Sequence, residues 1–395
     1  SSRARVSMLC SDGSPCRDDT RVDKDKSADF MDLLRTGGAW QLAAGAGDEV
    51  SEPQDSLAGR ELAGYELYQH IADGGMSRVY RARRADGRFD RDVAVKVSPA
   101  SLLDERLRDR FFQEQQILAS LNHRNIAQLY DAGIADEGWP YIVMELVEGT
   151  PIDQYCANID TATKLNLIID ICAALSYAHA RLVVHRDIKP GNVLVTDEGV
   201  PKLLDFGSAK LLTSSPAATQ MPSLTPRYAS PEQLLGNTAG VASDVYQVGL
   251  LLAEVLHPDL LDRPRSLMDA MQRASGNADH VLNREISRTL PKELISIVEQ
   301  CVRAAPEERY ASMSEVQQDI RNYLGGFPVS ATGNSRTYRS RKFLRRNAMY
   351  LATGAIVVLA FALSAAWYLT EVNAARDRAE LEAATSEEIA SFLVG

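Results

Sequence analysis

The sequence predicts an α+β fold in two parts, a small strand-rich part and a larger helical part, followed by one transmembrane helix. Residues 65–149 contain apolar runs that are typical of strands. Residues 161–181 form a long, mostly apolar segment that favours a buried helix. Residues 348–370 carry no charged side chain at all, over a length that is sufficient to cross a bilayer.

Composition and charge exclude several classes of protein. The chain has 395 residues, enough for two or three domains, and a formal net charge of −10. This negative charge argues against binding to nucleic acid, so no nucleic-acid partner is expected. The five cysteines are scattered without a CxxC pair, and we expect reduced thiols of a cytosolic domain rather than disulfides or a zinc site: Cys10, Cys16, Cys156, Cys172 and Cys301.

Residues 1–64 are predicted to be a flexible N-terminal arm. They are polar and broken up, apart from a short apolar patch at Phe30–Leu34. No secretory signal peptide is recognised, and no function is assigned to this segment.

A turn of small residues lies between two expected strands, 65–71 and 92–97. It contains Gly74, Gly75 and Ser77. Small residues allow backbone N–H groups to approach phosphate oxygens closely. The turn is therefore a candidate phosphate-binding loop, although its glycine pattern is degenerate.

The most informative stretch is His185–Asn192, which reads H-R-D-x-K-P-x-N. It offers an acid to orient a hydroxyl group, Asp187, a cation for a transferred phosphoryl group, Lys189, and an amide for a metal ion, Asn192. A predicted hairpin over residues 192–204 leads to Asp205, whose carboxylate is a second candidate metal ligand. No packing requirement asks for this order of polar groups, so it indicates phosphoryl-transfer chemistry.

In their order and spacing these motifs resemble those of the Hanks-type, or eukaryotic-like, Ser/Thr protein kinases, over residues 65–324. Other positions that match are Lys96, Glu114 on an expected helix over 104–120, Ser230-Pro231-Glu232, Asp244 and Arg309. The departures from the family pattern are Ala72, Ser77 and Ser230. The resemblance implies the bilobal protein-kinase fold, with a small β-rich N-lobe and a larger helical C-lobe.

The resemblance also implies the activity and the site. It implies an enzyme that uses ATP and Mg²⁺ and transfers the γ-phosphate to Ser or Thr of protein substrates. The implied catalytic residues are Asp187, Lys189, Lys96, Asn192 and Asp205, of which Asn192 and Asp205 would bind the metal. The implied nucleotide-binding residues are Ile71, Ala72, Gly74, Gly75, Ser77, Val79, Ala94, Lys96, Glu114, Met144, Glu145, Val147 and Leu194.

Supporting contacts are implied as well. Lys96 is expected to pair with Glu114, and Arg309 with Glu232. Asp244 is expected to brace the catalytic loop, and Phe206 to pack against His185 and Leu118. Arg186, next to Asp187, suggests activation by phosphorylation of a loop that contains Ser and Thr residues, because an arginine there would bind the phosphate: Thr213, Ser214, Ser215 and Thr219. Thr225 is expected to reach Asp187 and Lys189.

Residues 325–395 predict a single-pass membrane protein. A basic juxtamembrane linker, 325–347, precedes the predicted transmembrane helix 348–370, and an acidic segment follows it. The positive-inside rule then places the kinase domain in the cytoplasm, at the cell (inner) membrane. Residues 371–395 are expected to be an extracytoplasmic helical stub. The segment resembles bacterial kinases that continue into tetratricopeptide-type repeats, so we expect the natural protein to be longer.

Two other classes of protein compete with the enzyme. A pseudokinase scaffold at the membrane is favoured by the eroded glycine loop and opposed by the five filled catalytic positions. A phosphotransferase acting on small molecules is disfavoured by Lys189 and by Ser230-Pro231-Glu232. Activation as a homodimer in the bilayer stays open, and the sequence names neither the substrate nor the signal.

Overall fold

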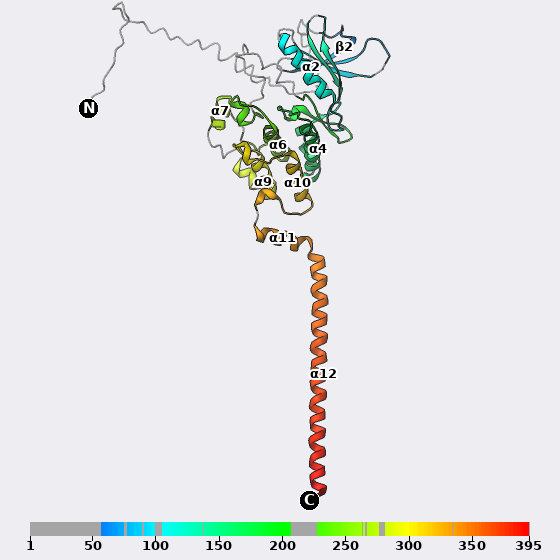
Figure 1. The fold of residues 1–395 in the computed structure, drawn as a ribbon, viewed down its shortest axis with the longest axis vertical. Coiled ribbons are helices and arrows are strands. Elements are labelled where there is room, and N and C mark those ends of the chain that lie inside the picture. The colour runs from blue at the N-terminus through cyan, green and yellow to red at the C-terminus, as the bar shows by residue number, and fades with distance from the viewer. Residues whose placement is uncertain are drawn as a thin grey trace, which may run out of the picture. The chain divides into compact units, whose positions relative to one another are not determined.

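The structure, a computed structural model, shows the elements drawn in Figure 1. It describes residues 57–74, 77–88, 91–98, 105–136, 138–206, 227–262, 264, 267–275, 281–333 and 335–394. The chain divides into two compact units. The described parts of the first unit lie within residues 57–120 and 128–147, and those of the second within 121–127, 148–206 and 227–394.

The first unit is a six-stranded antiparallel sheet with one described helix, α2 (Glu105–Ala119). The strand order is β1-β2-β3-β4-β6-β5. The strands are β1 (Arg60–Leu62), β2 (Tyr65–Gly74), β3 (Ser77–Arg84), β4 (Val93–Val97), β5 (Leu129–Ile134) and β6 (Pro140–Glu145). The strands expected over 65–71 and 92–97 are both present.

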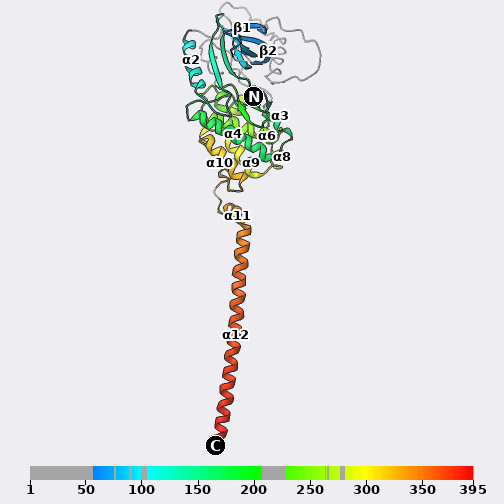
Figure 2. The same cartoon turned by 90° about the vertical axis from the view of Figure 1, so that its right-hand side faces the viewer.

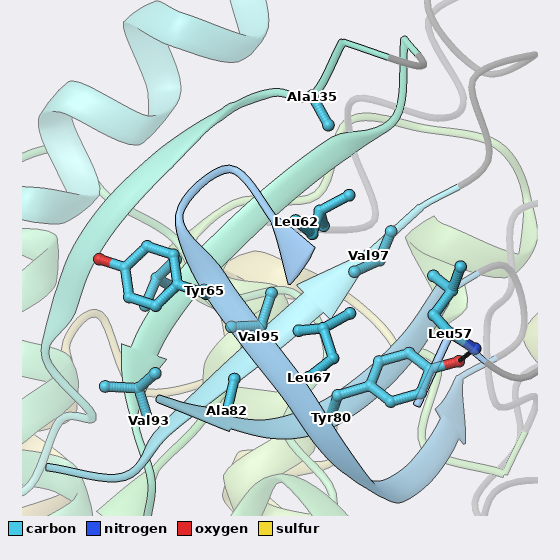
Figure 3. Packing of buried hydrophobic residues seen from close by; sticks show 11 residues of the cluster. Leu57, Leu62, Tyr65, Leu67, Tyr80, Ala82, Val93, Val95, Val97 and Ala135 are labelled. Atoms are coloured by element: carbon cyan, nitrogen blue, oxygen red, sulfur yellow. Dashed lines mark hydrogen bonds between the residues drawn. The ribbon is translucent and has the colours of Figure 1, made fainter. Parts of the chain in front are cut away.

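One apolar cluster holds this sheet together (Figure 3). Val93, Val95 and Val97 of β4 belong to it, together with Leu67 of β2 and Tyr80 of β3. Successive side chains of a strand point to opposite faces. Burial of the three valines therefore places the intervening Ala94 and Lys96 on the other face of β4.

The N-terminal arm was expected to reach residue 64, and this boundary is wrong. β1 pairs with β2, and Leu57, 7% exposed, packs in the apolar cluster. The Leu57 amide donates to the Tyr80 hydroxyl at 3.4 Å. β1 has only three residues, and Arg60 and Glu61 among them are exposed, so the sequence carried little strand signal there.

The second unit is built on four helices: α4 (Thr161–His179), α6 (Val241–Leu256), α9 (Lys292–Cys301) and α10 (Met313–Leu324). α4 packs against α6 and α10, and α9 packs against α6 and α10. The Asp160 side chain caps α4 by accepting hydrogen bonds from the backbone of Ala162 and Thr163. The long apolar helix expected from Thr161 is confirmed.

Shorter elements complete the second unit. A three-stranded sheet has the order β7-β8-β9, and its β8–β9 hairpin is the one expected from the sequence. These elements are β7 (Thr150–Pro151), α3 (Ile152–Tyr155), η2 (Cys156–Asn158), η3 (Pro190–Asn192), β8 (Val193–Val195), β9 (Pro201–Leu203), α5 (Pro231–Leu234), α7 (Leu267–Ser275), α8 (Arg284–Ser287), η4 (Pro306–Glu308) and η5 (Ser330–Thr332).

The C-terminal part contains two further helices, α11 (Arg336–Arg346) and α12 (Ala348–Val394). The juxtamembrane linker is therefore partly helical. The predicted transmembrane helix and the helical stub after it form one continuous helix, drawn from orange to red in Figure 2. Within it, Ala348–Ala383 is long and apolar enough to cross a membrane.

Candidate active site

A buried carboxylate on α6 holds the loop His185–Asn192, which we call the catalytic loop. Asp244 is fully buried, and its two oxygens accept hydrogen bonds from the backbone amides of His185, at 2.9 Å, and Arg186, at 2.8 Å. The His179 Nε2 atom lies 2.7 Å from the same carboxylate. The expectation that Asp244 braces this loop is confirmed.

A second brace, Gln247, was not expected from the sequence. Its Oε1 accepts from the Ile188 amide at 2.8 Å, and its Nε2 donates to the Arg186 carbonyl at 2.9 Å. The Gln233 side chain donates to the same carbonyl at 2.8 Å. Gln247 lies three residues after Asp244, on the same face of α6. The only sequence signal for this role is a glutamine one helical turn after Asp244, within a mostly apolar helix.

Arg186 itself has an unusual backbone, and one of its side-chain nitrogens has no partner among the described residues. Its φ is +70°, in the left-handed region that non-glycine residues rarely adopt. The hydrogen bonds to its backbone hold this conformation, which is typical of functional sites. Among the described residues its buried Nε has no hydrogen-bond partner.

The side chains of Lys189 and Asn192 converge on the carboxylate of Asp187. The Lys189 Nζ lies 2.9 Å from the Asp187 Oδ2. The Asn192 Nδ2 donates to the same Oδ2 at 2.9 Å and to the Asp187 carbonyl at 2.7 Å. Because its nitrogen faces Asp187, the Asn192 Oδ1 is the amide atom that could meet a cation.

Asp205 is fixed next to Asn192 through the chain that precedes it. The Leu204 amide donates to the Asn192 carbonyl at 2.9 Å, and the His185 Nε2 lies 2.9 Å from the Leu204 carbonyl. The φ of Asp205 is +56°, a second strained residue in the same site. An amide oxygen and a carboxylate are hard oxygen donors, which suits Mg²⁺.

His185 is a structural anchor in this arrangement. It is 1% exposed, and its ring centroid lies 4.5 Å from that of Phe206. The expected packing of Phe206 on His185 is confirmed. The expected contact of Phe206 with Leu118 would join the two units and stays a prediction.

In the first unit, β3, β4 and β6 position the candidate nucleotide-binding residues. Lys96 lies opposite Val79 of β3, and Ala94 lies opposite Met144 of β6. Val79 is 5% exposed and Ala94 is 7% exposed. Antiparallel partners have side chains on the same face. Lys96 therefore shares one face of the sheet with apolar side chains.

The candidate glycine loop joins β2 to β3. Ala72 pairs with Val79, and Gly74 pairs with Ser77, at the end of this hairpin. Ile71 is half-buried on β2. Gly75 lies outside the described residues, as does the side chain of Glu114, so the Lys96–Glu114 ion pair stays a prediction.

The remaining candidates are Glu145 and Val147, at and after the end of β6, and Leu194, on β8. The Glu145 amide, at the end of β6, donates to the Gln128 carbonyl at 2.8 Å, and its Oε2 accepts from the Gln128 amide at 3.1 Å. Val147 follows β6 in the first unit, and Leu194 lies on β8 in the second. That these residues contact the base of a bound nucleotide stays a prediction.

A bidentate ion pair fixes the segment that contains Glu232. The Arg309 Nη1 and Nη2 lie 2.8 Å and 2.9 Å from the two Glu232 oxygens, and Ser243 Oγ donates to Glu232 at 2.6 Å. Burial alone would raise the pKa of Glu232, but these hydrogen bonds outweigh it and lower that pKa to about 2. The expected Arg309–Glu232 pair is confirmed.

A second anchor in this region was not expected. Glu254 of α6 pairs with Arg227 and accepts a hydrogen bond from the Tyr228 hydroxyl. Burial raises the pKa of Tyr228.

The candidate phosphorylation sites, and the threonine expected to reach Asp187 and Lys189, lie outside the described residues: Thr213, Ser214, Ser215, Thr219 and Thr225.

The family is shown by comparison with known proteins. The model of the protein kinase domain matches residues 65–320, and the chain belongs to this family. A probable serine/threonine-protein kinase of Streptomyces coelicolor is 38% identical over 287 residues, which are 69% of this chain and 42% of that protein. Serine/threonine-protein kinase PknB of Mycobacterium leprae is 34% identical over 279 residues, 68% of this chain and 44% of that protein. The chain thus spans less than half the length of these two relatives.

Solved structures show the same fold. A mutant of the Mycobacterium tuberculosis PknI kinase domain superposes with a TM-score of 0.53 at 23% identity, over 68% of this chain and 99% of that one. A second mutant of this domain gives a TM-score of 0.52 at 24% identity, over 69% and 100%. At this level of identity the likeness concerns the fold, a strand-rich lobe and a helical lobe, as the sequence predicted.

Proposed function

We propose that this chain is an ATP-dependent Ser/Thr protein kinase anchored in a membrane. The observation that carries the proposal is the loop Asp187–Asn192, whose polar side chains converge and whose backbone is held by Asp244 and Gln247. A rigid loop of this kind is what positional catalysis of phosphoryl transfer needs. The match to the protein kinase family and the names of the relatives support the same conclusion.

Each side chain has a defined task in this proposal. Asp187 orients the Ser or Thr hydroxyl of a protein substrate. Lys189, which is 2.9 Å from Asp187, and Lys96 balance the charge of the phosphoryl oxygens. Asn192 and Asp205 would hold Mg²⁺, which when bound neutralises charge on the phosphates of ATP.

The nucleotide is assigned to residues of both units. The hairpin β2–β3 supplies Ile71, Ala72, Gly74, Gly75 and Ser77 for the phosphates. The base is assigned to apolar side chains and to the backbone after β6: Val79, Ala94, Met144, Glu145, Val147 and Leu194. Glu114 is assigned to hold Lys96.

We further propose that phosphorylation of the segment 208–220 activates the enzyme. The buried Arg186 Nε without a partner among the described residues supports this, because a phosphate would supply the acceptor. Pairing of two copies in the bilayer is a second proposed route to activation.

Phosphoryl transfer tests the catalytic proposal. The full chain in detergent micelles should transfer phosphate from labelled ATP and Mg²⁺ to a basic protein. Asp187→Asn and Asp205→Ala should abolish transfer, whereas Asp197→Asn, in the exposed turn between β8 and β9, should not change it. No transfer by the wild type would favour a pseudokinase scaffold, and full activity of Asp205→Ala would contradict the role of Asp205.

The membrane proposal rests on α12. Within its candidate span, a stretch of 18 residues has a mean hydropathy of 2.0 and is 0% buried, so nothing within the described structure covers this apolar surface. Resistance to alkaline carbonate should show integration. Protease added outside spheroplasts should cut after residue 371 and leave the kinase domain intact, and digestion of the kinase domain would reverse the proposed topology.

A further inference from the structure

The juxtamembrane linker is attached to the second unit rather than free. At its beginning Val329 is 1% exposed. Asp319 of α10 accepts hydrogen bonds from the Ser330 amide at 2.9 Å, the Ser330 hydroxyl at 2.6 Å and the Ala331 amide at 3.1 Å. One buried carboxylate therefore fixes the turn that precedes α11.

α11 is attached next, through two side chains one turn apart. Tyr338 donates its hydroxyl hydrogen to Glu293 of α9 at 2.7 Å and accepts from the Val329 amide at 3.2 Å. The Lys342 Nζ lies 2.9 Å from the other Glu293 oxygen, and both side chains of this ion pair are largely buried. Because residues four apart share a helix face, one side of α11 faces α9.

The opposite side of α11 is exposed and partly apolar. Phe343 is 53% exposed and Leu344 is 56% exposed. They follow Tyr338 by five and six residues, which is about 140° and 240° around the helix. Arg336, also exposed, lies on the same side. Two large apolar side chains next to arginines are typical of helices that lie at a membrane interface.

The positive charge of residues 335–347 fits a negatively charged partner. Residues 335–347 contain basic side chains and no acidic one: Arg336, Arg339, Arg341, Lys342, Arg345 and Arg346. Of these, Lys342 is neutralised by Glu293, and Arg346 stacks on the Phe327 ring at 4.2 Å. The other four are exposed arginines. A surface of this composition is complementary to anionic lipid.

We propose that α11 lies in the membrane interface, with its Tyr338–Lys342 side bound to the kinase domain and its Phe343–Leu344 side bound to anionic lipid. This inference rests on the proposed membrane span, because α12 begins at Ala348, two residues after α11 ends. α11 then links the helical lobe of the kinase to the bilayer surface through Glu293.

Hydrogen exchange of the full chain in vesicles tests this placement. Vesicles of phosphatidylcholine alone are compared with vesicles that also contain phosphatidylglycerol, and exchange is followed in the peptide 336–346. We expect slower exchange with the anionic lipid and loss of this protection at high salt. Each arginine at an anionic surface contributes about fivefold to binding. Arg336→Gln/Arg341→Gln should therefore speed exchange by about tenfold or more.

Two further variants make the test specific. Phe343→Ser/Leu344→Ser, which leaves the charge unchanged, should also lose protection. Arg376→Gln/Arg378→Gln removes the same charge on the other side of the uncharged stretch 348–370 and should leave the 336–346 peptide unchanged. Equal exchange in both lipids, with the chain retained after alkaline carbonate, would overturn the placement of α11 alone. Release by carbonate would overturn the membrane span and this inference with it.

Discussion

Replacement of Asp244 by Asn tests how the catalytic loop is held. The Asp244 carboxylate accepts from two backbone amides of the loop and lies 2.7 Å from the His179 Nε2. An asparagine has one accepting oxygen and one donating NH₂ group, so one loop amide would face a donor instead of an acceptor.

The expected cost follows from this geometry. Hydrogen bonds to a charged acceptor contribute about 1.5–3 kcal/mol, and a buried donor without a partner costs about 1–3 kcal/mol. We expect Asp244→Asn to lower the free energy of unfolding by about 2–4 kcal/mol. Because a shift of the catalytic loop by about 1 Å can cost on the order of 10²-fold in rate, kcat should fall far more than the folded fraction.

A matched control separates stability from catalysis. Asp319 is another buried carboxylate, which accepts from the Tyr310 hydroxyl at 2.8 Å and from Ser330. Asp319→Asn should destabilise the protein by a similar amount, since it too loses charged acceptors, but its hydrogen bonds do not reach the catalytic loop. Both variants are measured in the full chain, by urea unfolding and by steady-state phosphoryl transfer. Equal kcat for the two variants, after correction for the folded fraction, would refute the argument.

Three further predictions concern packing, pH and thiols. Gly249→Ala should destabilise by about 1–3 kcal/mol, because an added Cβ would clash with Cys301, whereas Gly240→Ala, with nothing within 4 Å, should cost about 1 kcal/mol or less in urea unfolding. Because the pKa of Glu232 is lowered from 4.5 to about 2, its contacts stabilise the fold at pH values above 4.5, and this contribution is lost as the pH falls towards about 2. Glu232→Gln should therefore flatten the dependence of the free energy of unfolding on pH between these values, as measured by urea unfolding. Burial raises the pKa of the Cys172 thiol to about 12 and that of Cys301 well above its ordinary value, so mass spectrometry should find both unalkylated by iodoacetamide until the protein is unfolded.

Much of the second unit could be predicted because its motifs are local. His185–Asn192 carries its chemistry within eight residues, and the hairpin that leads to Asp205 is short. Asp244 and the Arg309–Glu232 pair were predicted from the family pattern, and the structure confirms their contacts. A buried charged side chain must be paired, so few other residue types can stand at these positions, which makes them recognisable in a sequence.

Other parts depend on contacts between distant segments and could not be predicted. Gln247 and Glu254 look like ordinary helix residues until the loop and Tyr228 are placed beside them. β1 is too short for a periodic pattern. The binding of α11 to α9 rests on Glu293, an acidic residue with no local sign of a partner forty-five residues away.

A structure of the full chain with Mg²⁺ and a non-hydrolysable ATP analogue tests the central claim most directly. The account predicts that the Asn192 Oδ1 and the Asp205 carboxylate bind the metal at about 2.1 Å, with the Lys96 ammonium on the phosphates and Asp187 facing the γ-phosphate. A nucleotide held elsewhere, or a metal ion that contacts neither Asn192 nor Asp205, would contradict it.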